Sequence, residues 1–411
     1  MNGNRLVAAA ALAVMAVAYP GNPAFAADGP YALTNANLFD GVNNAITENV
    51  TVLVRDGQIE KIEANGSDVP RDYTVIDVEG NFLMPGMIDV HTHMNTIERA
   101  KRALDSGVTT VRVAGVNAYE DIALRELVRS SKLAGPEVLA AGVFVRPDLG
   151  PSVLADPRLA GFYGGVDGEE DLRRLVNINV EHGVDVIKTV ATQRSGLPDT
   201  DPRQQVYAER ELRVIVDEAA KHDVPVLVHA HGDEGARAAV LAGARSIEHG
   251  TYLSTETLEL MKERGTWFVP TYITIVDLKE EHKHYVLRLR GRHMLPQIER
   301  GIREAHRLGV KLATGADASY EESSINRISL EIEIFANFGL SNFEALQAGT
   351  VSAAELLRVD DRTGRIAEGY EADIIAVPGN PLENIRVLQD VLLVMSNGQL
   401  ALKRIPFAVT D

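Results

Sequence analysis

Two histidines separated by a single threonine end an apolar run near residue 90. The run reads MPGMIDVHTHM over residues 84–94, so His91 and His93 lie two positions apart. Side chains alternate between the two faces of a β-strand, and residues two positions apart therefore point in the same direction. Both imidazoles can then bind one cation. The spacing predicts a metal-binding pair at the end of a strand.

Five further titratable residues accompany apolar runs later in the chain. They are Lys188 in VIKTVAT, His229 and His231 in VLVHAHG, His249 in SIEHG and Asp317 in TGADAS. A single histidine at a strand end is more often structural than ligating, but this many such residues indicate a shared site. Nitrogen and oxygen ligands suit zinc and tolerate manganese or cobalt. The chain has no cysteine, which excludes thiolate ligands and thiol nucleophiles.

Eight apolar runs of β character must position these residues. They cover residues 87–93, 108–114, 138–145, 184–191, 225–231, 246–250, 267–272 and 311–317. Amphipathic segments such as 121–132 and 210–222 lie between them and are typical of helices. Eight β/α units predict an α/β fold with a closed (β/α)8 TIM-like barrel, whose catalytic groups lie at the carboxyl ends of the strands. An open doubly wound sheet is the alternative topology, which the strand count disfavours.

Short alternating runs broken by turns lie on both sides of the barrel and are typical of small antiparallel strands. Neither flank is large enough to bury a good core alone. We therefore expect residues 28–84 and 356–411 to pair into one small composite β-sandwich domain, beside a barrel spanning residues 85–355.

The first 26 residues have the pattern of a secretory signal peptide. Arg5 precedes an apolar centre over residues 6–18, and a small-x-small sequence ends at Ala26. The apolar centre is short for a membrane span, which disfavours a retained anchor. We expect an exported protein, periplasmic or secreted, with no membrane attachment after cleavage. The formal net charge of −17 makes the chain a poor candidate for binding nucleic acid.

The ordered motifs resemble those of the amidohydrolase superfamily of metal-dependent hydrolases. They are IDVHTHM, VIKTVAT, VHAHGDEGARAAVLAGARSIEHG, TGADAS and TGRIAEGYEADIIAV. The histidine spacing in the fifth and sixth runs is similar to that in a branch of the superfamily with two metal ions. This branch contains Xaa-Pro and Xaa-Arg dipeptidases, ochratoxinase-like amidases and imidazolonepropionase-related proteins. The motifs are specific to the superfamily and much less specific to a substrate. The resemblance implies two divalent metal ions, with zinc favoured, a small-molecule substrate and a homo-oligomer.

The resemblance also implies a role for each candidate ligand. The more buried ion would be held by His91, His93 and Asp317, and the second ion by His229 and His249. Lys188 would be carboxylated to a carbamate that bridges both ions. A lysine whose pKa is lowered by burial and neighbouring charge supplies the neutral amine that carboxylation needs.

Two residues are the catalytic candidates under this resemblance. Asp317 would act as general base on a metal-bridging hydroxide and then pass the proton to the leaving amine. We interpret His231 as a substrate contact at the rim of the site. In the alternative ordering His231 is the ligand and His229 lies beneath it.

Three further residues are candidate substrate contacts. Arg194, in the loop after Lys188, could bind a substrate carboxylate through two hydrogen bonds or be a solvated surface residue. Many relatives have a Gly-Gly turn in this loop, which this chain lacks. Tyr252 follows EHG, and Tyr272 ends the seventh run; both could also be packing residues. The charged segment 277–300 is predicted to be an elongated helix and loop beside the site, with a lid role left open.

The motifs favour hydrolysis of the amide bond of a dipeptide or an N-acyl amino acid. A lactone, an ochratoxin-type amide or a cyclic amide is an alternative substrate. The spacing of His231 and Glu234 is similar to that of mononuclear deaminases, which do not need Lys188. A purely binding member of the fold would be expected to have lost a ligand or Asp317, and none of these residues is missing.

Overall fold

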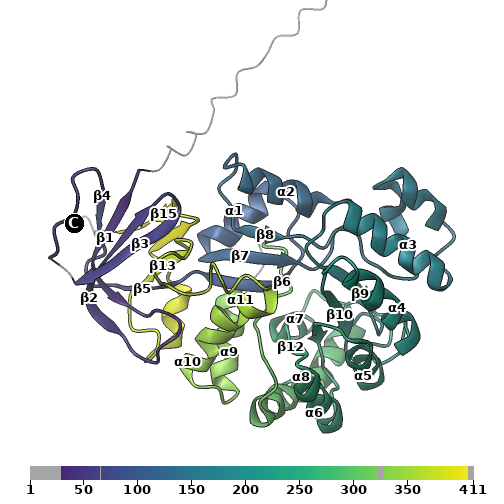
Figure 1. The fold of residues 1–411 in the computed structure, drawn as a ribbon. Coiled ribbons are helices and arrows are strands. Elements are labelled where there is room, and N and C mark those ends of the chain that lie inside the picture. The colour runs from purple at the N-terminus through teal and green to yellow at the C-terminus, as the bar shows by residue number, and fades with distance from the viewer. Residues whose placement is uncertain (1–28, 65, 323–326, 406–411) are drawn as a thin grey trace, which may run out of the picture.

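The computed structural model describes residues 29–64, 66–322 and 327–405. The predicted signal peptide lies outside these ranges. A small part made of strands lies beside a larger part in which strands alternate with helices (Figure 1). Within the described ranges, none of the helices has the length and apolar character needed to cross a membrane.

Seven regular parallel strands form two sheets in the larger part. The first sheet contains β6 (Met87–Thr92), β7 (Val108–Val113) and β8 (Glu137–Leu139). The second contains β9 (Ile187–Val190), β10 (Val226–Ala230), β11 (Ser246–His249) and β12 (Trp267–Val269). Almost every residue of these strands is buried. Burial on both faces explains why the strands read as continuous apolar runs in the sequence.

Isolated bridges join the two sheets into a ring. On one side Val145 pairs with Thr189 of β9. On the other side the segment 311–318 pairs with both neighbours, through Phe268 with Leu312 and through Thr92 with Ala318. This segment occupies the place of the eighth strand, so eight extended segments surround the centre as the (β/α)8 prediction requires.

Two of the predicted strands are less regular than expected. The run 138–145 is a regular strand only at its start, because side chains of Asp121 and Asn179 accept the backbone N–H groups of residues 141–143 and replace the ladder. The run 311–317 forms only isolated bridges, and it ends at Asp317, whose φ of 49° lies in the left-handed region and cannot continue a strand.

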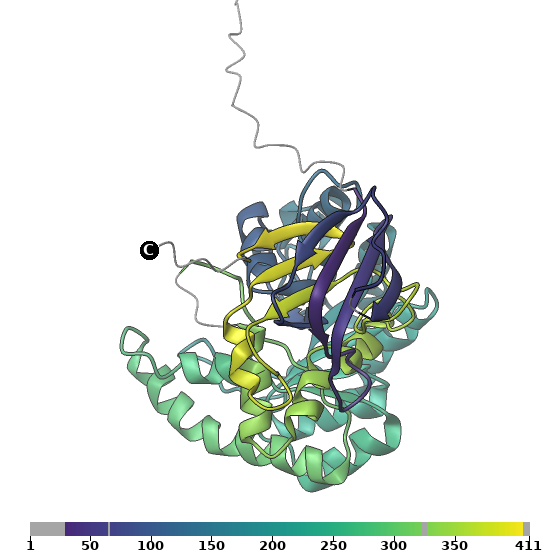
Figure 2. The same ribbon diagram turned by 90° about the vertical axis from the view of Figure 1, so that its left-hand side faces the viewer.

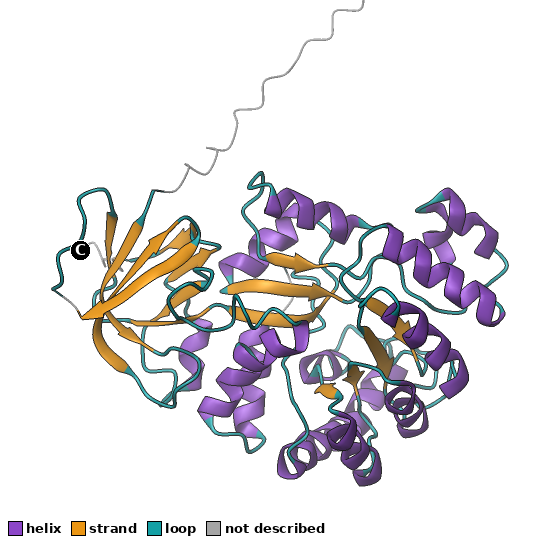
Figure 3. Ribbon diagram, in the orientation of Figure 1, coloured by secondary structure: helices purple, strands orange, loops and turns teal. Residues whose placement is uncertain are grey.

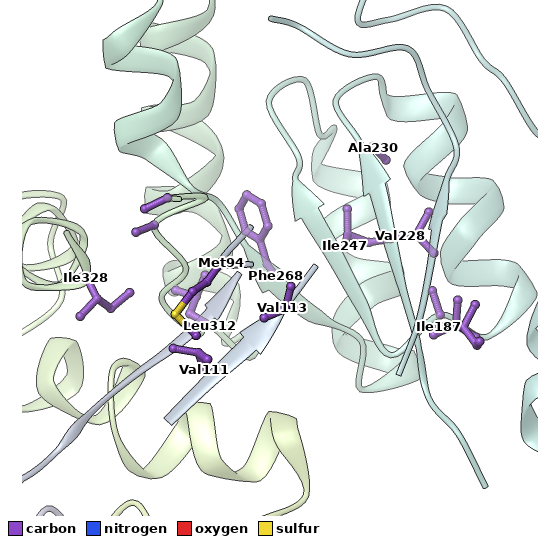
Figure 4. Close-up of a cluster of buried hydrophobic side chains, with 14 of the residues drawn as sticks. Met94, Val111, Val113, Ile187, Val228, Ala230, Ile247, Phe268, Leu312 and Ile328 are labelled. Carbon is purple, nitrogen blue, oxygen red and sulfur yellow. The ribbon is translucent and has the colours of Figure 1, made fainter. Parts of the chain in front are cut away.

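Helices cover the outside of the ring (Figure 3). They are α1 (Ile97–Asp105), α2 (Glu120–Arg129), α3 (Gly168–Glu181), α4 (Glu209–Ala220), α5 (Asp233–Ala242), α6 (Thr255–Arg264), α7 (Tyr272–Asp277), α8 (Tyr285–Leu308), α9 (Ile328–Asn337), α10 (Asn342–Ala348) and α11 (Val351–Leu357). The short 3-10 helices are η1 (Gly150–Leu154), η2 (Pro157–Phe162) and η3 (Ile385–Gln389). Apolar side chains between strands and helices form the main core, including Val113, Ile187, Val228 and Phe268 (Figure 4).

Tyr272 was expected to end the seventh strand, but it begins α7. The strand β12 ends at Val269 because Pro270 has no N–H to donate and Thr271 has a left-handed φ of 51°. The segment 277–300 contains the end of α7, a connecting loop and more than half of α8.

The smaller part is one eight-stranded sheet built from both ends of the chain (Figure 2). Its strands are β1 (Tyr31–Leu38), β2 (Thr47–Arg55), β3 (Gln58–Ala64), β4 (Thr74–Asp77), β5 (Phe82–Pro85), β13 (Ile374–Val377), β14 (Leu393–Ser396) and β15 (Gln399–Lys403). β5 pairs antiparallel with β13 and so joins the two chain ends. The strands share an apolar core that includes Leu33, Val52 and Met395. The sheet therefore anchors β6, which follows β5 directly and carries the first histidines.

Candidate metal centre

The seven titratable residues predicted from the strand ends line one cavity. This cavity has a volume of about 580 Å³ and opens where the carboxyl ends of the strands meet. His91, His229 and His249 lie at the ends of β6, β10 and β11, and Lys188 lies within β9. His93, His231 and Asp317 follow the ends of their strands. The structure thus brings together in one cavity the residues that the sequence pattern singled out.

Two overlapping groups of side chains in the cavity can each hold a metal ion. One group is His91, His249 and Asp317, and the other is His229, His231 and His249; in each, the ligand atoms lie within 4.8 Å of one another. Asp317 Oδ1 also lies 3.1 Å from His93 Nε2, so His93 adjoins the first group. Such a concentration of imidazole and carboxylate donors matches the ligand preference of zinc and related ions.

Hydrogen bonds fix which ring nitrogen three of these histidines offer. His91 Nδ1 lies 2.5 Å from Glu248 Oε2, and His93 Nδ1 lies 3.0 Å from the Gly115 carbonyl oxygen. His249 Nδ1 lies 2.7 Å from Thr271 Oγ1, a hydroxyl that already donates to the Pro270 carbonyl. Each partner accepts, so each Nδ1 carries the proton and each Nε2 keeps its lone pair for a metal.

The Nε2 atom of His91 is the clearest test of whether these residues fit a metal ion. This nitrogen is buried and has no hydrogen-bond partner among the described residues. Buried polar atoms without a partner are rare and need an explanation. A cation that His91 shares with Asp317 supplies one, since Asp317 Oδ1 lies 3.6 Å from this nitrogen.

The second pair of histidines is arranged differently. His229 Nε2 lies 3.2 Å from the Gln193 carbonyl oxygen and therefore carries the proton, which leaves the lone pair on Nδ1. His231 was expected at the rim, but it is buried and only 1% exposed. Its ring stacks on that of His249 at 4.7 Å, and Thr192 and Thr251 hydrogen-bond to its backbone N–H and its Nδ1. These contacts hold His231 in the wall of the cavity rather than at its rim.

Burial favours the neutral form of four of these histidines. It lowers the pKa of His91 to about 4 and that of His231 to about 3, and it also lowers the pKa values of His229 and His249 well below the ordinary value. Metal ions bind the neutral imidazole, so protons do not compete for these nitrogens at neutral pH.

The amine of Lys188 is buried beside the histidines. Burial lowers its pKa to about 8, while Glu248 and Asp317 oppose the shift and Arg112 favours it. The Nζ atom lies 5.8 Å from the centre of the Phe144 ring. Within the described ranges no acidic group lies within ion-pair distance of this amine. A buried amine with this pKa has a substantial neutral fraction near pH 8, as carboxylation requires.

The three remaining candidates divide into one cavity residue and two packing residues. Arg194 lines the cavity and is exposed. Tyr252 and Tyr272 are not among the residues that line it. The ring of Tyr252 lies 5.9 Å from that of His293, and Tyr272 packs edge-on against Phe338 at 4.9 Å.

Several residues of the site escaped the sequence analysis. Phe144, Arg146, Thr274 and Leu278 also line the cavity from loops and from α7. Beneath it, Glu248 receives a hydrogen bond of 2.8 Å from Arg112, and both are buried. One signal was available for this pair, because each is a charged residue inside a run predicted to be a barrel strand, and buried charges are almost always paired.

Comparison with known proteins agrees with this geometry. Residues 82–401 match the model of the amidohydrolase family. Over 391 residues the chain is 29% identical to the ochratoxinase of Aspergillus niger, which covers 82% of this chain and 79% of the ochratoxinase. Over 389 residues it is 25% identical to the imidazolonepropionase of Kosmotoga olearia, covering 86% of this chain and 90% of that protein.

Solved structures show the same architecture. The crystal structure of a Xaa-Pro dipeptidase with bound methionine in its active site has a TM-score of 0.82 and 28% identity, covering 90% of this chain and 99% of that one. The crystal structure of A. niger ochratoxinase has a TM-score of 0.77 and 26% identity, covering 92% of this chain and 96% of that one. With its barrel and its histidine- and aspartate-lined cavity, the chain belongs to the amidohydrolase family and is a hydrolase acting on carbon–nitrogen bonds.

Proposed function

We propose that this protein hydrolyses the amide bond of dipeptides or N-acyl amino acids with two divalent metal ions, preferably zinc. The observation that carries the proposal is the convergence of donor atoms into two overlapping groups on one cavity. The likeness to a Xaa-Pro dipeptidase and to an ochratoxinase supports an amide substrate.

The residues divide between the two ions as the family resemblance implies. His91, His93 and Asp317 would hold one ion, His229 and His249 the other, and a carboxylated Lys188 would lie between them. When bound, the ions would activate water and polarise the amide carbonyl. His231 would either contact the substrate or replace His229 as a ligand, since the ligand atoms of His229, His231 and His249 all lie within 4.8 Å of one another.

Asp317 is placed to move the proton that amide hydrolysis requires. Burial raises the pKa of this carboxyl, but the nitrogen groups around it hold the pKa well below its usual range. The carboxylate is therefore ionised and can accept a proton from water. Thr274 Oγ1 donates to Oδ2 at 3.2 Å and fixes its orientation. Asp317 then gives the proton to the leaving amine, which must be neutral to depart.

The deaminase alternative receives no support from the structure. Glu234, which would shuttle protons in such an enzyme, is exposed in the first turn of α5 and does not line the cavity. Its charge instead suits the helix N-terminus.

The test is release of free amino acids by the zinc-loaded protein. The panel contains Ala-Pro, Ala-Arg, Ala-Met and Ala-Phe, their N-acetyl amino acid counterparts, a lactone and a cyclic amide. We expect hydrolysis within the peptide and N-acyl groups, and Asp317→Asn lowers it by about 10²- to 10⁴-fold. Activity confined to the lactone or the cyclic amide would contradict the proposal, as would an Asp317→Asn variant with full activity.

We also propose that the mature protein is exported and forms a homo-oligomer. The leader pattern over residues 1–26 supports export, and only the family resemblance supports self-association. Fractionation of expressing cells and sedimentation of the purified protein test the two proposals separately.

A further inference from the structure

Two arginines line the cavity beside the candidate metal centre. Arg146 follows the bridge residue Val145, and Arg194 lies in the loop after β9. Arg146 donates from Nη2 to the Leu149 carbonyl oxygen at 3.3 Å, while its buried Nε has no partner among the described residues. Within those residues neither arginine lies within ion-pair distance of a carboxylate. In a chain with 58 acidic and 41 basic residues, unpaired cations inside a cavity require an explanation.

The acidic residues of the cavity wall do not pair with these arginines. Asp317 faces His93, and Asp148 accepts a hydrogen bond of 2.8 Å from the backbone N–H of Gly150. Burial and the nearby charge of Arg194 lower the pKa of Arg146, and the charge of Asp148 only partly opposes this shift. Two neighbouring guanidinium groups repel each other unless an anion lies between them.

One aromatic ring connects Arg146 with the candidate metal centre. The ring of Phe144 stacks on that of His93 with centres 6.0 Å apart. The guanidinium carbon of Arg146 lies 5.5 Å from the centre of the same ring. Arg146 and His93 therefore contact a common ring, which keeps the guanidinium within the reach of about three residues of an extended peptide, at about 3.5 Å per residue.

The loop that carries Arg194 is held in place from outside. Arg290 of α8 donates to the carbonyl oxygens of Ser195 at 2.5 Å and Leu197 at 2.6 Å, and it also donates to that of Thr200. Three carbonyl acceptors on one guanidinium restrict the loop, so Arg194 is kept at the mouth of the cavity.

We propose that Arg146 and Arg194 together bind a free carboxylate of the substrate, so that the enzyme acts only on amides of amino acids with an unblocked carboxyl group. A guanidinium recognises a planar carboxylate through paired, charge-assisted hydrogen bonds. Apolar lining from Phe144, Val190, Val206 and Leu278 gives room for an uncharged side chain. The inference rests on the proposed amide hydrolysis and adds the group that selects the substrate.

The first arm of the test compares the fastest substrate of the panel with its C-terminal amide. The zinc-loaded wild-type protein is expected to prefer the free carboxylate by about 100-fold in kcat/KM. Arg146→Met and Arg194→Met raise KM for the carboxylate substrate about 10- to 100-fold and bring the ratio of kcat/KM between the free and the blocked substrate toward one. Arg203→Met is the matched control, because Arg203 is exposed, pairs with Asp201 and does not line the cavity.

The second arm measures binding without turnover. The probes are 3-phenylpropanoate and 3-phenylpropanamide, titrated calorimetrically into the zinc-loaded protein. We expect only the carboxylate to bind, and each cavity variant weakens it about tenfold or more, whereas Arg203→Met does not. If Arg146→Met melts at a lower temperature than the wild type, the test of carboxylate binding rests on Arg194→Met alone, because the Arg194 side chain is exposed.

The two arms separate this inference from the proposed function. If no panel member is hydrolysed but carboxylate binding depends on the two arginines, the carboxylate subsite stands and amide hydrolysis fails. If amides are hydrolysed equally with free and blocked carboxyl groups, and the arginine variants match Arg203→Met, the subsite is overturned while the function stands.

Discussion

The buried amine of Lys188 lines the same cavity as the two groups of candidate ligands. Its pKa, lowered to about 8 by burial, gives an amine that can be neutral at a position where a protonated lysine would repel cations. A carboxylated lysine would instead bring a negative charge to the centre. We therefore expect the number of bound ions to depend on this residue.

Lys188→Ala is expected to bind fewer than two zinc ions per chain and to lose at least about 10³-fold in kcat/KM. Addition of acetate or propionate should restore part of the activity, because a free carboxylate can take the place of the carbamate. Elemental analysis and amide hydrolysis with and without the acid check this. A variant that keeps two ions and full activity would exclude Lys188 as a ligand.

Glu248 orients His91 and is itself held by Arg112, so Glu248→Gln is expected to weaken zinc binding about 10- to 100-fold. It should also destabilise the fold by about 3–5 kcal/mol, because the buried guanidinium loses its anion. Competition with a chelator and thermal melting measure the two effects. Glu137→Gln, which breaks another largely buried ion pair with Arg362, should lower stability without changing zinc affinity. Equal zinc affinities for both variants would contradict an orienting role.

The candidate ligands could be singled out because each lies in or at the end of an apolar run, and the two-residue period of a strand alone gives His91 and His93 a common direction. The partners behind them could not be predicted in the same way. Arg112 and Glu248 lie in strands that are not neighbours in the ring, so only the closed barrel brings them together. The same applies to Arg146, whose loop approaches the cavity only after folding.

At the level of elements, α7 links two candidate ligands to the outer layer. Thr271 precedes it and hydrogen-bonds His249, while Thr274 within it hydrogen-bonds Asp317. The carboxylate of Glu331 in α9 accepts the backbone N–H groups of Tyr272 and Ile273 and fixes the start of this helix. The charge pattern of 277–300 indicated a helix and a loop but not this arrangement, because Pro270 and the left-handed Thr271 set the chain direction locally.

Arg290→Met releases three carbonyl groups of the loop that carries Arg194. Since the loop no longer holds its position, KM is expected to rise about tenfold with kcat nearly unchanged. Steady-state kinetics with the best panel substrate provide the measurement. Arg300→Met on the same helix serves as control, because its guanidinium contacts only Gln297 among the described residues. A fall in kcat without a change in KM would argue against a role in substrate binding.

For the whole molecule, the apolar runs indicated parallel strands buried on both faces, and their number, eight, favoured a closed barrel over an open doubly wound sheet. Its closure was not predictable residue by residue. The segments 143–145 and 311–318 close the ring through isolated bridges, and side-chain acceptors and a left-handed aspartate decide where regular pairing stops.

The stability of the molecule should fall in mild acid, partly through Glu218. Burial raises the pKa of this carboxyl, but hydrogen bonds from Lys221, Asn177 and Arg173 outweigh it and lower the pKa to about 2. A carboxyl with a lowered pKa stabilises the fold above its ordinary value of 4.5, and the contribution is lost as pH falls toward 2.

Glu218→Gln is therefore expected to reduce the free energy of unfolding by about 1–2 kcal/mol at pH 7 and to flatten its decline between about pH 5 and pH 3. Denaturant titrations at several pH values give this directly. The control is Glu259→Gln, an exposed position on α6. If the free energy of unfolding depended on pH equally in both variants, the hydrogen bonds of Glu218 between α3 and α4 would contribute nothing to acid stability.

The central claim is that two metal ions act together in hydrolysing an amide. The most direct measurement is the rate of amide hydrolysis as a function of the number of zinc ions bound per chain. Metal-free protein is titrated with zinc in bicarbonate buffer, and bound zinc and hydrolysis of the best panel substrate are followed together. We predict that binding saturates at two ions per chain and that hydrolysis reaches its maximum only as the second ion binds. Full activity at one ion per chain, or saturation of binding at one ion, would contradict the account.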